Sequence, residues 1–388
     1  MAKNSRMVKW FVALAVILLY FLPFYQKYFS DRQADWNDLE VTALTGEKTQ
    51  GSAPSYFKEN FVNQARPGMK CHVSSLAAVG EARLICTWYA GSREGASDVA
   101  IYKAFYDENT GAWTKPEVLL DRPQCLAELR RWVGKLGNAV VINDHEGGLW
   151  LFYATLLGGW STASLNYKGS QDGGQTWSDS RKLILSPFFN LAANVKNNGL
   201  PLSPGAYLLP VYQEFLRKFG QVVLWRPHEE GLSYQIRRMV GTGRTLQPVL
   251  IPQNKRRLLA FFRNAAGNGE NYILRAESQD AGQTWSALTR TTLPNPNSGF
   301  AMIRLPDGAI LGAINHAFQD RSDLTLVVSR DGGQNWQILK VLENSPGKEY
   351  SYPFLLRSRG KYHLTYTYER DRIKHVVFND AWLRQNNQ

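Results

Sequence analysis

One turn sequence occurs three times and constrains the fold more than any other feature of the chain. Its form is Ser-x-Asp-x-Gly-x-Thr/Asn-Trp, and the copies are residues 170–177, 278–285 and 329–336. In such a turn the Asp accepts hydrogen bonds from backbone N–H groups, the Gly takes a positive φ, and the Trp packs back as an apolar plug. A strand-forming stretch precedes each copy, as at residues 324–328. Each copy therefore predicts a turn that closes a β-hairpin.

The spacing of these turns predicts a repeat architecture. With two weaker copies included, the acidic residues fall at 107, 172, 229, 280 and 331, and the last two gaps are both 51 residues. This period suits the four-stranded blades of a β-propeller. A second repeat consists of six hairpin-like segments, each with a polar or aromatic first residue followed by an apolar strand. The six first residues are His72, Asn138, Asn198, Gln247, Asn297 and Tyr352.

Six such units predict an all-β chain that folds as a six-bladed β-propeller over residues 66–388. Two stacked β-sandwiches are disfavoured because they do not require a repeat of this period. The last unit has no Asp turn after it. We therefore expect residues 55–66, from the beginning of the chain, to supply the closing strand of the sixth blade.

The N-terminal residues differ in character from the rest of the chain. Residues 1–9 carry three basic side chains, and residues 10–25 carry no charge. We expect residues 10–25 to form one transmembrane helix that acts as an uncleaved signal anchor, because no small-x-small cleavage site follows. The charge bias predicts a cytoplasmic N-terminus. Residues 26–65 would then form a stalk, and the propeller would lie in the periplasm, on a bacterial inner membrane.

The charge and cysteine content narrow the range of partners. The chain has a formal net charge of +12, but its basic residues are scattered, and no zinc-finger spacing or glycine-rich phosphate loop occurs. We therefore expect no nucleic acid as a partner, and we expect a surface that attracts anionic glycans or lipid headgroups. The three cysteines are an odd number without metal-ligand spacing, so we expect no metal and no other cofactor.

Residues at the beginnings of inner strands should converge at the axis of a propeller. We therefore expect the six first residues of the hairpin units to line an axial funnel. The second strands end in a further set of polar residues, which includes Arg93, Glu94, Arg263 and His316. Arg93, Arg263 and Arg321 come from three different units. Because guanidinium binds carboxylate in a bidentate fashion, they predict a site for a planar anion.

The Asp turns, called Asp boxes below, resemble those of the sialidase (neuraminidase) superfamily in sequence and register, over roughly residues 66–385. The resemblance, closest to bacterial sialidase-like proteins with BNR repeats, implies three arginines on a sugar carboxylate, a Tyr–Glu nucleophile pair and an Asp acid/base. Arg263 or Arg275 resembles the second arginine, and Arg321 resembles the third. Tyr350 or Tyr352 resembles the nucleophile. Asp98 resembles the acid, with Glu94 as a rival.

Two positions depart from the family pattern. His72 stands where the first arginine is expected, and Gln247 stands where the glutamate is expected. Gln cannot act as a general base, and a Tyr without its Glu is a poor nucleophile. His72 instead offers a group that titrates near neutral pH. Together with Tyr and the arginines, it could remove the proton α to a uronate carboxylate.

Three functions therefore remain open. The first is a membrane-anchored, sialidase-like hydrolase that cleaves terminal acidic sugars from a glycan as an exo-glycosidase. The second is a uronate polysaccharide lyase with His72 as its base. The third is a non-catalytic propeller that binds glycans. In all three, Asn138, Asn198, Asn297 and His316 are expected to contact the sugar.

Overall fold

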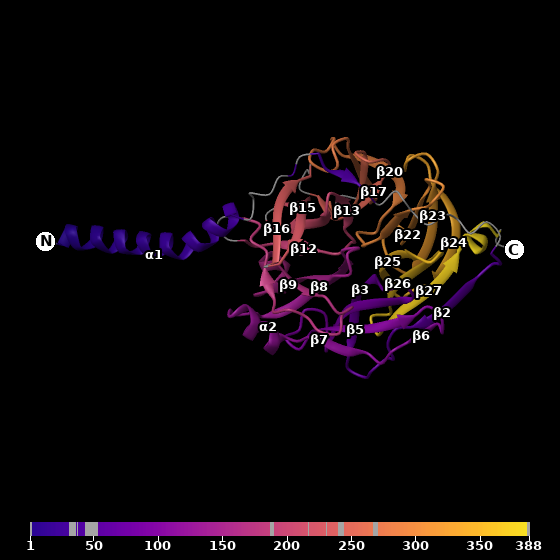
Figure 1. Cartoon of the computed structure of the whole chain (residues 1–388), viewed down its shortest axis with the longest axis horizontal. Helices are drawn as coiled ribbons and strands as arrows, with labels where there is room; N and C mark the ends of the chain where they lie inside the picture. Colours follow the sequence, from indigo (N-terminus) through magenta and orange to yellow (C-terminus); the bar gives the residue numbers. More distant parts are fainter. Residues whose placement is uncertain are drawn as a thin grey trace.

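The computed structural model of the chain is an all-β propeller of six blades (Figure 1). It describes residues 2–30, 36, 38–42, 53–186, 190–215, 217–229, 231–239, 244–266 and 271–385. The prediction of six blades is confirmed. Each blade is an antiparallel sheet, and most of its consecutive strands pair in chain order. The exceptions are β7, which pairs with β5, β12, which pairs with β14, and the N-terminal strands β1 and β2, which join the edges of two blades.

The strands of the first three blades are as follows. Blade 1 contains β3 (Lys70–Val79), β4 (Arg83–Gly91), β5 (Ala100–Asp107), β6 (Ala112–Trp113) and β7 (Glu117–Leu120). Blade 2 contains β8 (Lys135–Asn143), β9 (Leu149–Leu156), β10 (Ala163–Ser170) and β11 (Arg181–Lys182). Blade 3 contains β12 (Ala193–Val195), β13 (Leu200–Ser203), β14 (Ala206–Glu214), β15 (Lys218–His228), β16 (Gly231–Arg238) and the short β1 (Glu40–Val41).

The other three blades have four strands each. Blade 4 contains β17 (Thr245–Pro252), β18 (Leu258–Asn264), β19 (Tyr272–Ser278) and β20 (Thr289–Pro294). Blade 5 contains β21 (Ala301–Arg304), β22 (Ile310–Ile314), β23 (Asp323–Ser329) and β24 (Gln337–Asn344). Blade 6 contains β25 (Tyr350–Ser358), β26 (Lys361–Tyr368), β27 (Arg372–Asn379) and β2 (Phe57–Phe61). The helical segments are α1 (Ala2–Ser30), α2 (Arg122–Leu129), the 3-10 turn η1 (Trp160–Thr162) and α3 (Asp380–Arg384).

The hydrophobic core lies between neighbouring blades. The central strands are buried on both faces, and β9 is buried along its whole length, which explains its nearly continuous apolar sequence. One cluster joins Ile85 and Phe105 of blade 1 to Leu149 and Leu151 of blade 2. Because each sheet packs on two neighbours, the ring requires a closing contact between blades 6 and 1.

The sixth blade is completed by the segment expected to supply its closing strand. β2 pairs antiparallel with β27 from Phe57↔Phe378 to Phe61↔Lys374. The prediction that residues 55–66 complete the last blade is therefore confirmed. The strand ties the two ends of the propeller together in one sheet (Figure 1).

The Asp boxes have the predicted geometry. Asp172 accepts hydrogen bonds from the backbone N–H of Gln175 (3.0 Å) and Thr176 (2.9 Å) and from the Thr176 hydroxyl (2.6 Å). The hydrogen bonds from Thr176 are the main cause that lowers the pKa of Asp172 to about 2. Trp177 donates its indole N–H to the carbonyl oxygen of Gly174 at 3.2 Å. The turns are thus structural and close each hairpin by local hydrogen bonds.

The prediction of an inner-membrane anchor is wrong. Among the residues that the structure describes, no helix is long and apolar enough to cross a membrane. The uncharged run of residues 10–25 has sixteen residues, and an α-helix of that length rises about 24 Å, against a hydrocarbon core of about 30 Å. This finding overturns the single-pass topology with a periplasmic propeller.

Part of the segment expected to form a stalk packs on blade 3. Trp36, Leu39 and Val41 are buried in a cluster with Leu202 and Leu208, and β1 pairs with β13. Residues 31–35, 37 and 43–52 of that segment lie outside the described residues.

Four inner strands contain an irregularity near their first residues. The pairing register shifts between His72 and Ser75, Leu136 and Ala139, Leu246 and Val249, and Ser351 and Phe354. At three of these bulges a residue has a positive φ, namely Val73, Gln247 and Tyr352. Because a bulge redirects the side chains beside it, these strands turn selected residues away from the interblade core and toward the axis.

Candidate active site at the propeller axis

A group of polar side chains meets where the inner strands begin, and we call it the axial cluster. Its members are His72, Glu94, Gln247, Arg263, Asn297, Arg321, Glu349, Tyr352 and Arg370. They come from blades 1, 4, 5 and 6 and from the loops beside them. The elements that carry them are far apart in the chain, so the cluster exists only in the closed propeller.

Tyr352 lies at the centre of the axial cluster. Its hydroxyl accepts a hydrogen bond of 3.0 Å from Nη1 of Arg263. The Arg321 guanidinium carbon lies 5.5 Å from the centroid of its ring, and the His72 ring packs edge-on at 4.5 Å between centroids. The side chain is 9% exposed. One phenol oxygen is therefore held beside two guanidinium groups at a site that is almost closed to water.

Arg263 is bonded to neutral partners only. Its Nη1 also donates to Oε1 of Gln247 at 3.3 Å, and its Nε donates to Oδ1 of Asn297 at 2.8 Å. Within the described part of the chain, no ion pair involves Arg263. Asn297 also accepts a hydrogen bond of 3.1 Å from Nη2 of Arg321 at its backbone carbonyl. Asn297 thus holds the two arginines side by side. No described carboxylate lies within ion-pair distance of Arg263, although its charge opposes the burial that raises the pKa of the more distant Glu214.

Arg370 takes part in the cluster with two carboxylates. It donates to Glu349 at 2.7 Å and to Glu94 at 2.6 Å, and Glu349 also pairs with Arg321 at 3.3 Å. Burial alone would raise the pKa of Glu349, but hydrogen bonds from Arg370 and Ser351 lower it to about 2. For Glu94, burial is likewise outweighed by His72 and Arg370, and its pKa is lowered. Both carboxylates are therefore ionised at neutral pH.

His72 is almost completely buried. Its Nδ1 lies 2.9 Å from the Thr367 hydroxyl, which also accepts the Val73 backbone N–H at 3.2 Å. Since that hydroxyl has no other acceptor among the described residues, the arrangement favours donation to Nδ1 and a proton on Nε2. Nε2 is buried without a partner. Burial lowers the pKa of His72 to about 3, so the ring is a neutral group in the position expected for a first arginine.

Two further tyrosines, Tyr89 and Tyr212, lie beside His72 and Gln247. The Tyr212 hydroxyl accepts hydrogen bonds from Asn138 (3.0 Å) and Gln247 (3.4 Å). The Tyr89 ring lies 5.9 Å from His72, and its hydroxyl is buried without a partner in the structure. Buried polar atoms are normally hydrogen-bonded. The free Tyr89 hydroxyl and His72 Nε2 are therefore available to a ligand or to water.

Two residues of blade 3 hold the beginnings of the inner strands of the next three blades, and the strands of blades 4 and 6 are bulged there. The Lys196 ammonium group donates to the carbonyl oxygens of Phe300 (2.8 Å) and Pro353 (2.7 Å). Asn197 donates to the carbonyl oxygens of Gln247 and Pro248. Burial lowers the pKa of Lys196 well below its ordinary value. These bonds fix the backbone on which Gln247 and Tyr352 stand.

The structure separates the two candidate nucleophiles. In a regular strand, Tyr350 and Tyr352 would point to the same face. The bulge between Ser351 and Phe354 breaks this alternation. Tyr350 consequently packs in the core of blades 5 and 6, with its ring 5.2 Å from that of Tyr368. Only Tyr352 reaches the axial cluster.

Several predicted residues lie away from the axial cluster. Arg93 and His316 have exposed side chains, and no contact in the described structure joins either one to the cluster. Asp98 is exposed and accepts hydrogen bonds from the backbone N–H and the hydroxyl of Ser92, both at 3.0 Å. Asn198 lines a separate cavity of about 170 Å³ between the inner strands of blades 3 to 6. Arg275 lies on β19 and pairs with Glu277.

Sequence reasoning missed Arg370, Glu349, Tyr89 and Tyr212. Arg370 follows the second strand of its blade, as Arg93 does. The position after the second strand, which was used to choose Arg93, therefore also pointed to Arg370. Glu349 comes directly before β25 and had no distinguishing pattern. Tyr89 and Tyr212 lie within apolar strands, where the sequence pattern predicts that a tyrosine belongs to the hydrophobic core.

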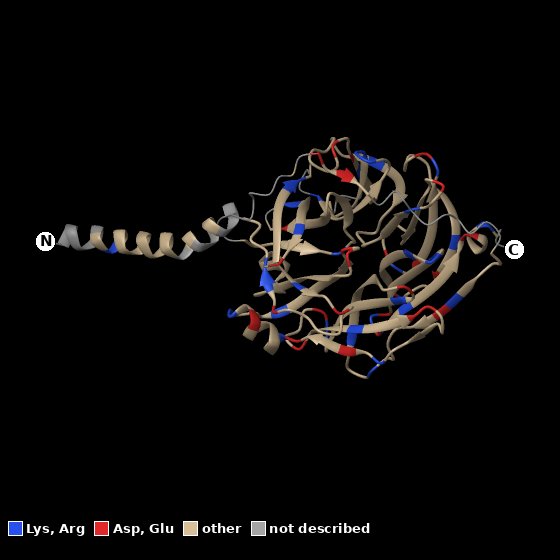
Figure 2. Ribbon diagram, in the orientation of Figure 1, with Lys and Arg blue, Asp and Glu red and all other residues tan. Residues whose placement is uncertain are grey.

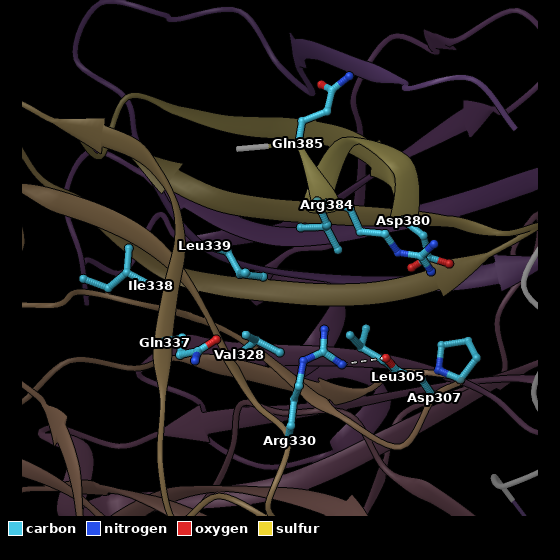
Figure 3. A pocket seen from close by; sticks show the side chains of 12 residues that line it. Leu305, Asp307, Val328, Arg330, Gln337, Ile338, Leu339, Asp380, Arg384 and Gln385 are labelled. Atoms are coloured by element: carbon cyan, nitrogen blue, oxygen red, sulfur yellow. Dashed lines mark hydrogen bonds and ion pairs between the residues drawn. The ribbon is translucent and has the colours of Figure 1, made fainter. Parts of the chain in front are cut away.

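Charges of both signs are spread around the whole propeller (Figure 2). A cavity of about 590 Å³ lies between β24 and α3, beside the third Asp box. There Arg330 pairs with Asp307 at 3.0 Å (Figure 3). None of the predicted site residues lines this cavity, so it is separate from the axial cluster.

Comparison with known proteins supports this architecture. The model of the BNR repeat-like domain matches residues 82–364, which is more than half of the chain. No curated protein matches the sequence.

Solved structures give the same picture of the fold. A Hadza microbial sialidase superposes with a TM-score of 0.66 at 17% identity, over 80% of this chain and 66% of its own. The intramolecular trans-sialidase of Ruminococcus gnavus gives 0.64 at 16% identity, over 82% and 96%. The sialidase of Trypanosoma rangeli gives 0.65 at 12% identity, over 84% and 59%. At these identities the likeness establishes the fold alone. The chain belongs to the BNR repeat-like domain family and is a sialidase-like β-propeller.

Proposed function

We propose that the chain is a sialidase-like exo-glycosidase, which hydrolyses the bond that joins a terminal acidic sugar to a glycan. The observation that carries this proposal is the hydrogen bond between Arg263 and Tyr352 at the axis. It combines a guanidinium that has no ion-pair partner among the described residues, suited to a sugar carboxylate, with a phenol oxygen suited to nucleophilic attack.

In this proposal the carboxylate lies against Arg263 and Arg321. Asn297 holds both guanidiniums in register, so little rearrangement is needed on binding. His72 Nε2–H and the Tyr89 hydroxyl supply neutral hydrogen bonds on the side where the family pattern has its first arginine. Glu94 and Glu349 orient Arg370 and Arg321 and are not the proton donors, because both are held ionised.

The reaction would proceed in two steps. The Tyr352 hydroxyl gives its proton to a water molecule while its oxygen bonds to the anomeric carbon, and as the glycosidic C–O bond breaks the departing oxygen takes a proton from that water. A second water molecule then attacks the same carbon and gives a proton to the departing Tyr352 oxygen, which releases the sugar and restores the phenol. Asp98, the acid expected from the sequence, is exposed and has no contact with the axial cluster in the described structure, so these steps do not use it. The Arg263 N–H stabilises the negative charge that Tyr352 carries during attack and departure. Gln247 orients Arg263 and takes no proton.

A uronate lyase is the second candidate, and one observation favours it. His72 packs against Tyr352 at 4.5 Å, while Gln247 cannot serve as a base. In that reaction His72 would take the proton α to the carboxylate, and the leaving oxygen at C4 would depart with a proton from Tyr352. The lyase ranks second because the contact with Thr367 favours a proton on Nε2 and because a pKa of about 3 makes His72 a weak base.

Product analysis distinguishes these functions. The full-length protein would be incubated with glycans that end in sialic acid or in uronic acid, and the released sugar would be identified by mass spectrometry and ultraviolet absorbance. Hydrolysis adds one water and leaves a saturated sugar, whereas elimination leaves an unsaturated one. A saturated product that is lost in Tyr352→Phe and retained in Tyr350→Phe is expected. An unsaturated product lost in His72→Gln would establish the lyase. Glycan binding without any product would show that the chain is a non-catalytic propeller that binds glycans.

A further inference from the structure

A small cavity lies directly beside the axial cluster, at the boundary of blades 1 and 2. Its volume is about 180 Å³, and it is lined by Glu94, Gly95, Lys135, Leu136, Leu156 and Trp160. Glu94 belongs to both places, because its carboxylate holds Arg370 at 2.6 Å. A ligand bound in this cavity would therefore lie next to a ligand bound at the axial cluster.

Lys135 contributes a charge to this cavity. It begins β8 and pairs in register with Leu156. A Cβ placed on Gly95 would lie 3.2 Å from its ammonium nitrogen, so Nζ lies against the backbone at the cavity wall. Within the described part of the chain, Lys135 has no ion pair or side-chain hydrogen bond, and the neighbouring Glu94 is engaged by Arg370. The ammonium group is therefore free for an anionic ligand.

Trp160 contributes a rigid apolar wall. Its ring lies over Gly137, where a Cβ would come within 3.1 Å of Cζ3. The turn that carries it is held by Thr162, whose hydroxyl accepts the backbone N–H groups of Leu157 (3.1 Å) and Gly158 (2.8 Å). Together with the buried Leu136 and Leu156, an indole in a fixed position suits the apolar C–H face of a pyranose ring.

We propose that this cavity is a second sugar subsite, which holds the residue next to the terminal acidic sugar and selects one that also carries an anionic group. Lys135 binds that anion, and Trp160 packs against the ring. This inference rests on the proposed function of the axial cluster. It narrows the substrate class to glycans with negative charges on consecutive sugars, such as polymers of acidic sugars.

The test uses matched pairs of disaccharides with the full-length protein. In one pair, sialic acid is linked either to a second sialic acid or to galactose. In the other pair, a uronic acid is linked either to a second uronic acid or to a neutral hexose. Dissociation constants are measured by calorimetry with the Tyr352→Phe variant, which does not turn over. We expect the anionic member of a pair to bind about 10- to 100-fold more tightly, as for a hydrogen bond to a charged group.

Three substitutions assign the preference to its residues. Lys135→Met should abolish this preference and leave binding of the neutral member within about twofold, which also shows that the variant is folded. Lys115→Met, on an exposed lysine of the same region of sequence, should leave the preference intact. Trp160→Ala should weaken both members of a pair.

The outcomes separate this inference from the proposed function. Terminal-sugar binding that depends on Arg263, without any preference that depends on Lys135, would overturn the second subsite alone. The absence of binding to every acidic disaccharide would overturn both.

Discussion

The Tyr352 hydroxyl and the Arg263 guanidinium are joined by a hydrogen bond of 3.0 Å, although the two residues are 89 positions apart in the chain. They come from blades 6 and 4, and each owes its position to an irregular strand. Gln247 and Tyr352, which both bond to Arg263, have positive φ values of 50° and 52°. Non-glycine residues take such values only where the surrounding structure compensates the strain, as at ligand sites.

Substitution of Tyr352 by Phe should abolish catalysis without unfolding the protein. The change removes one hydroxyl and keeps the ring contact with His72, so kcat should fall about a thousandfold while substrate still binds. Tyr350→Phe is the matched control, because Tyr350 lies two residues away and packs in the core. The measurement is the rate of sugar release. An equal loss of sugar release in Tyr352→Phe and Tyr350→Phe would contradict the assignment of Tyr352 as the nucleophile.

Substitution of Arg263 by Gln should weaken binding of an acidic sugar about 10- to 100-fold. The guanidinium is the cation of the axial cluster that has no ion-pair partner among the described residues, and its removal leaves the sugar carboxylate with Arg321. Arg275→Gln serves as the control, since Arg275 pairs with Glu277 on β19. Affinities for the free acidic sugar and for its methyl ester would be compared by calorimetry. If Arg263→Gln weakens both ligands alike, the residue does not recognise the carboxylate.

Substitution of Gly299 by Ala should disturb the site more than the fold. A Cβ at this position would lie 2.9 Å from Oε1 of Gln247 and 3.0 Å from Cδ1 of Tyr352, so the phenol must move. Displacements of this kind can cost about a hundredfold in rate, whereas overpacking costs about 1–3 kcal/mol of stability. Gly158→Ala is the control, because nothing lies within 4 Å of a Cβ there. Unchanged kinetics in Gly299→Ala would show that the position of Tyr352 is not critical.

A chain of buried hydrogen bonds joins blades 1 and 6 and should make the stability depend on pH. The Trp113 indole N–H donates to Nδ1 of His375 at 3.2 Å, and Nε2 of His375 lies 3.1 Å from Nδ1 of His363. Nε2 of His363 lies 3.2 Å from the Glu108 carboxylate. With Trp113 as the fixed donor, each histidine holds one proton and donates it to the next group. Burial lowers the pKa of His363 and lowers that of His375 well below its ordinary value.

The sign of this dependence follows from proton uptake. Below about pH 6.5 the histidines of the unfolded chain bind protons that the folded protein does not, so stability is full above that pH and is lost as pH falls. At pH 5 the loss due to His375 should be roughly 2 kcal/mol. Thermal unfolding from pH 7.5 to 5 would measure it. His375→Asn, whose amide can still accept from Trp113, should make the profile less steep, while His363 and His72 keep their own contributions. The exposed His316→Asn should leave the slope unchanged. A wild-type profile that is flat over this range would contradict the prediction.

The sequence alone determined the propeller, its six blades and, to within a few residues, where the inner strands begin. This was possible because each Asp box is held by local bonds, such as those between Asp172 and Thr176 four residues later. Repeated local motifs are visible in the sequence, and their period reports the size of a blade. The same reasoning identified His72, Gln247, Arg263, Asn297, Arg321 and Tyr352, all of which belong to the axial cluster.

Only the tertiary structure decided which neighbouring residue faces the axis. Tyr352 rather than Tyr350 reaches it because a bulge reverses the alternation of β25, and alternation is what sequence reasoning assumes. Arg370 joins the arginines because Glu94 of blade 1 and Glu349, which directly precedes the first strand of its own blade, compensate its charge, whereas Arg93 remains exposed. Side-chain direction at a bulge and charge pairing between blades depend on residues hundreds of positions apart. A local sequence pattern does not predict these two features, because the contacts that stabilise them form only when the six blades close into a ring.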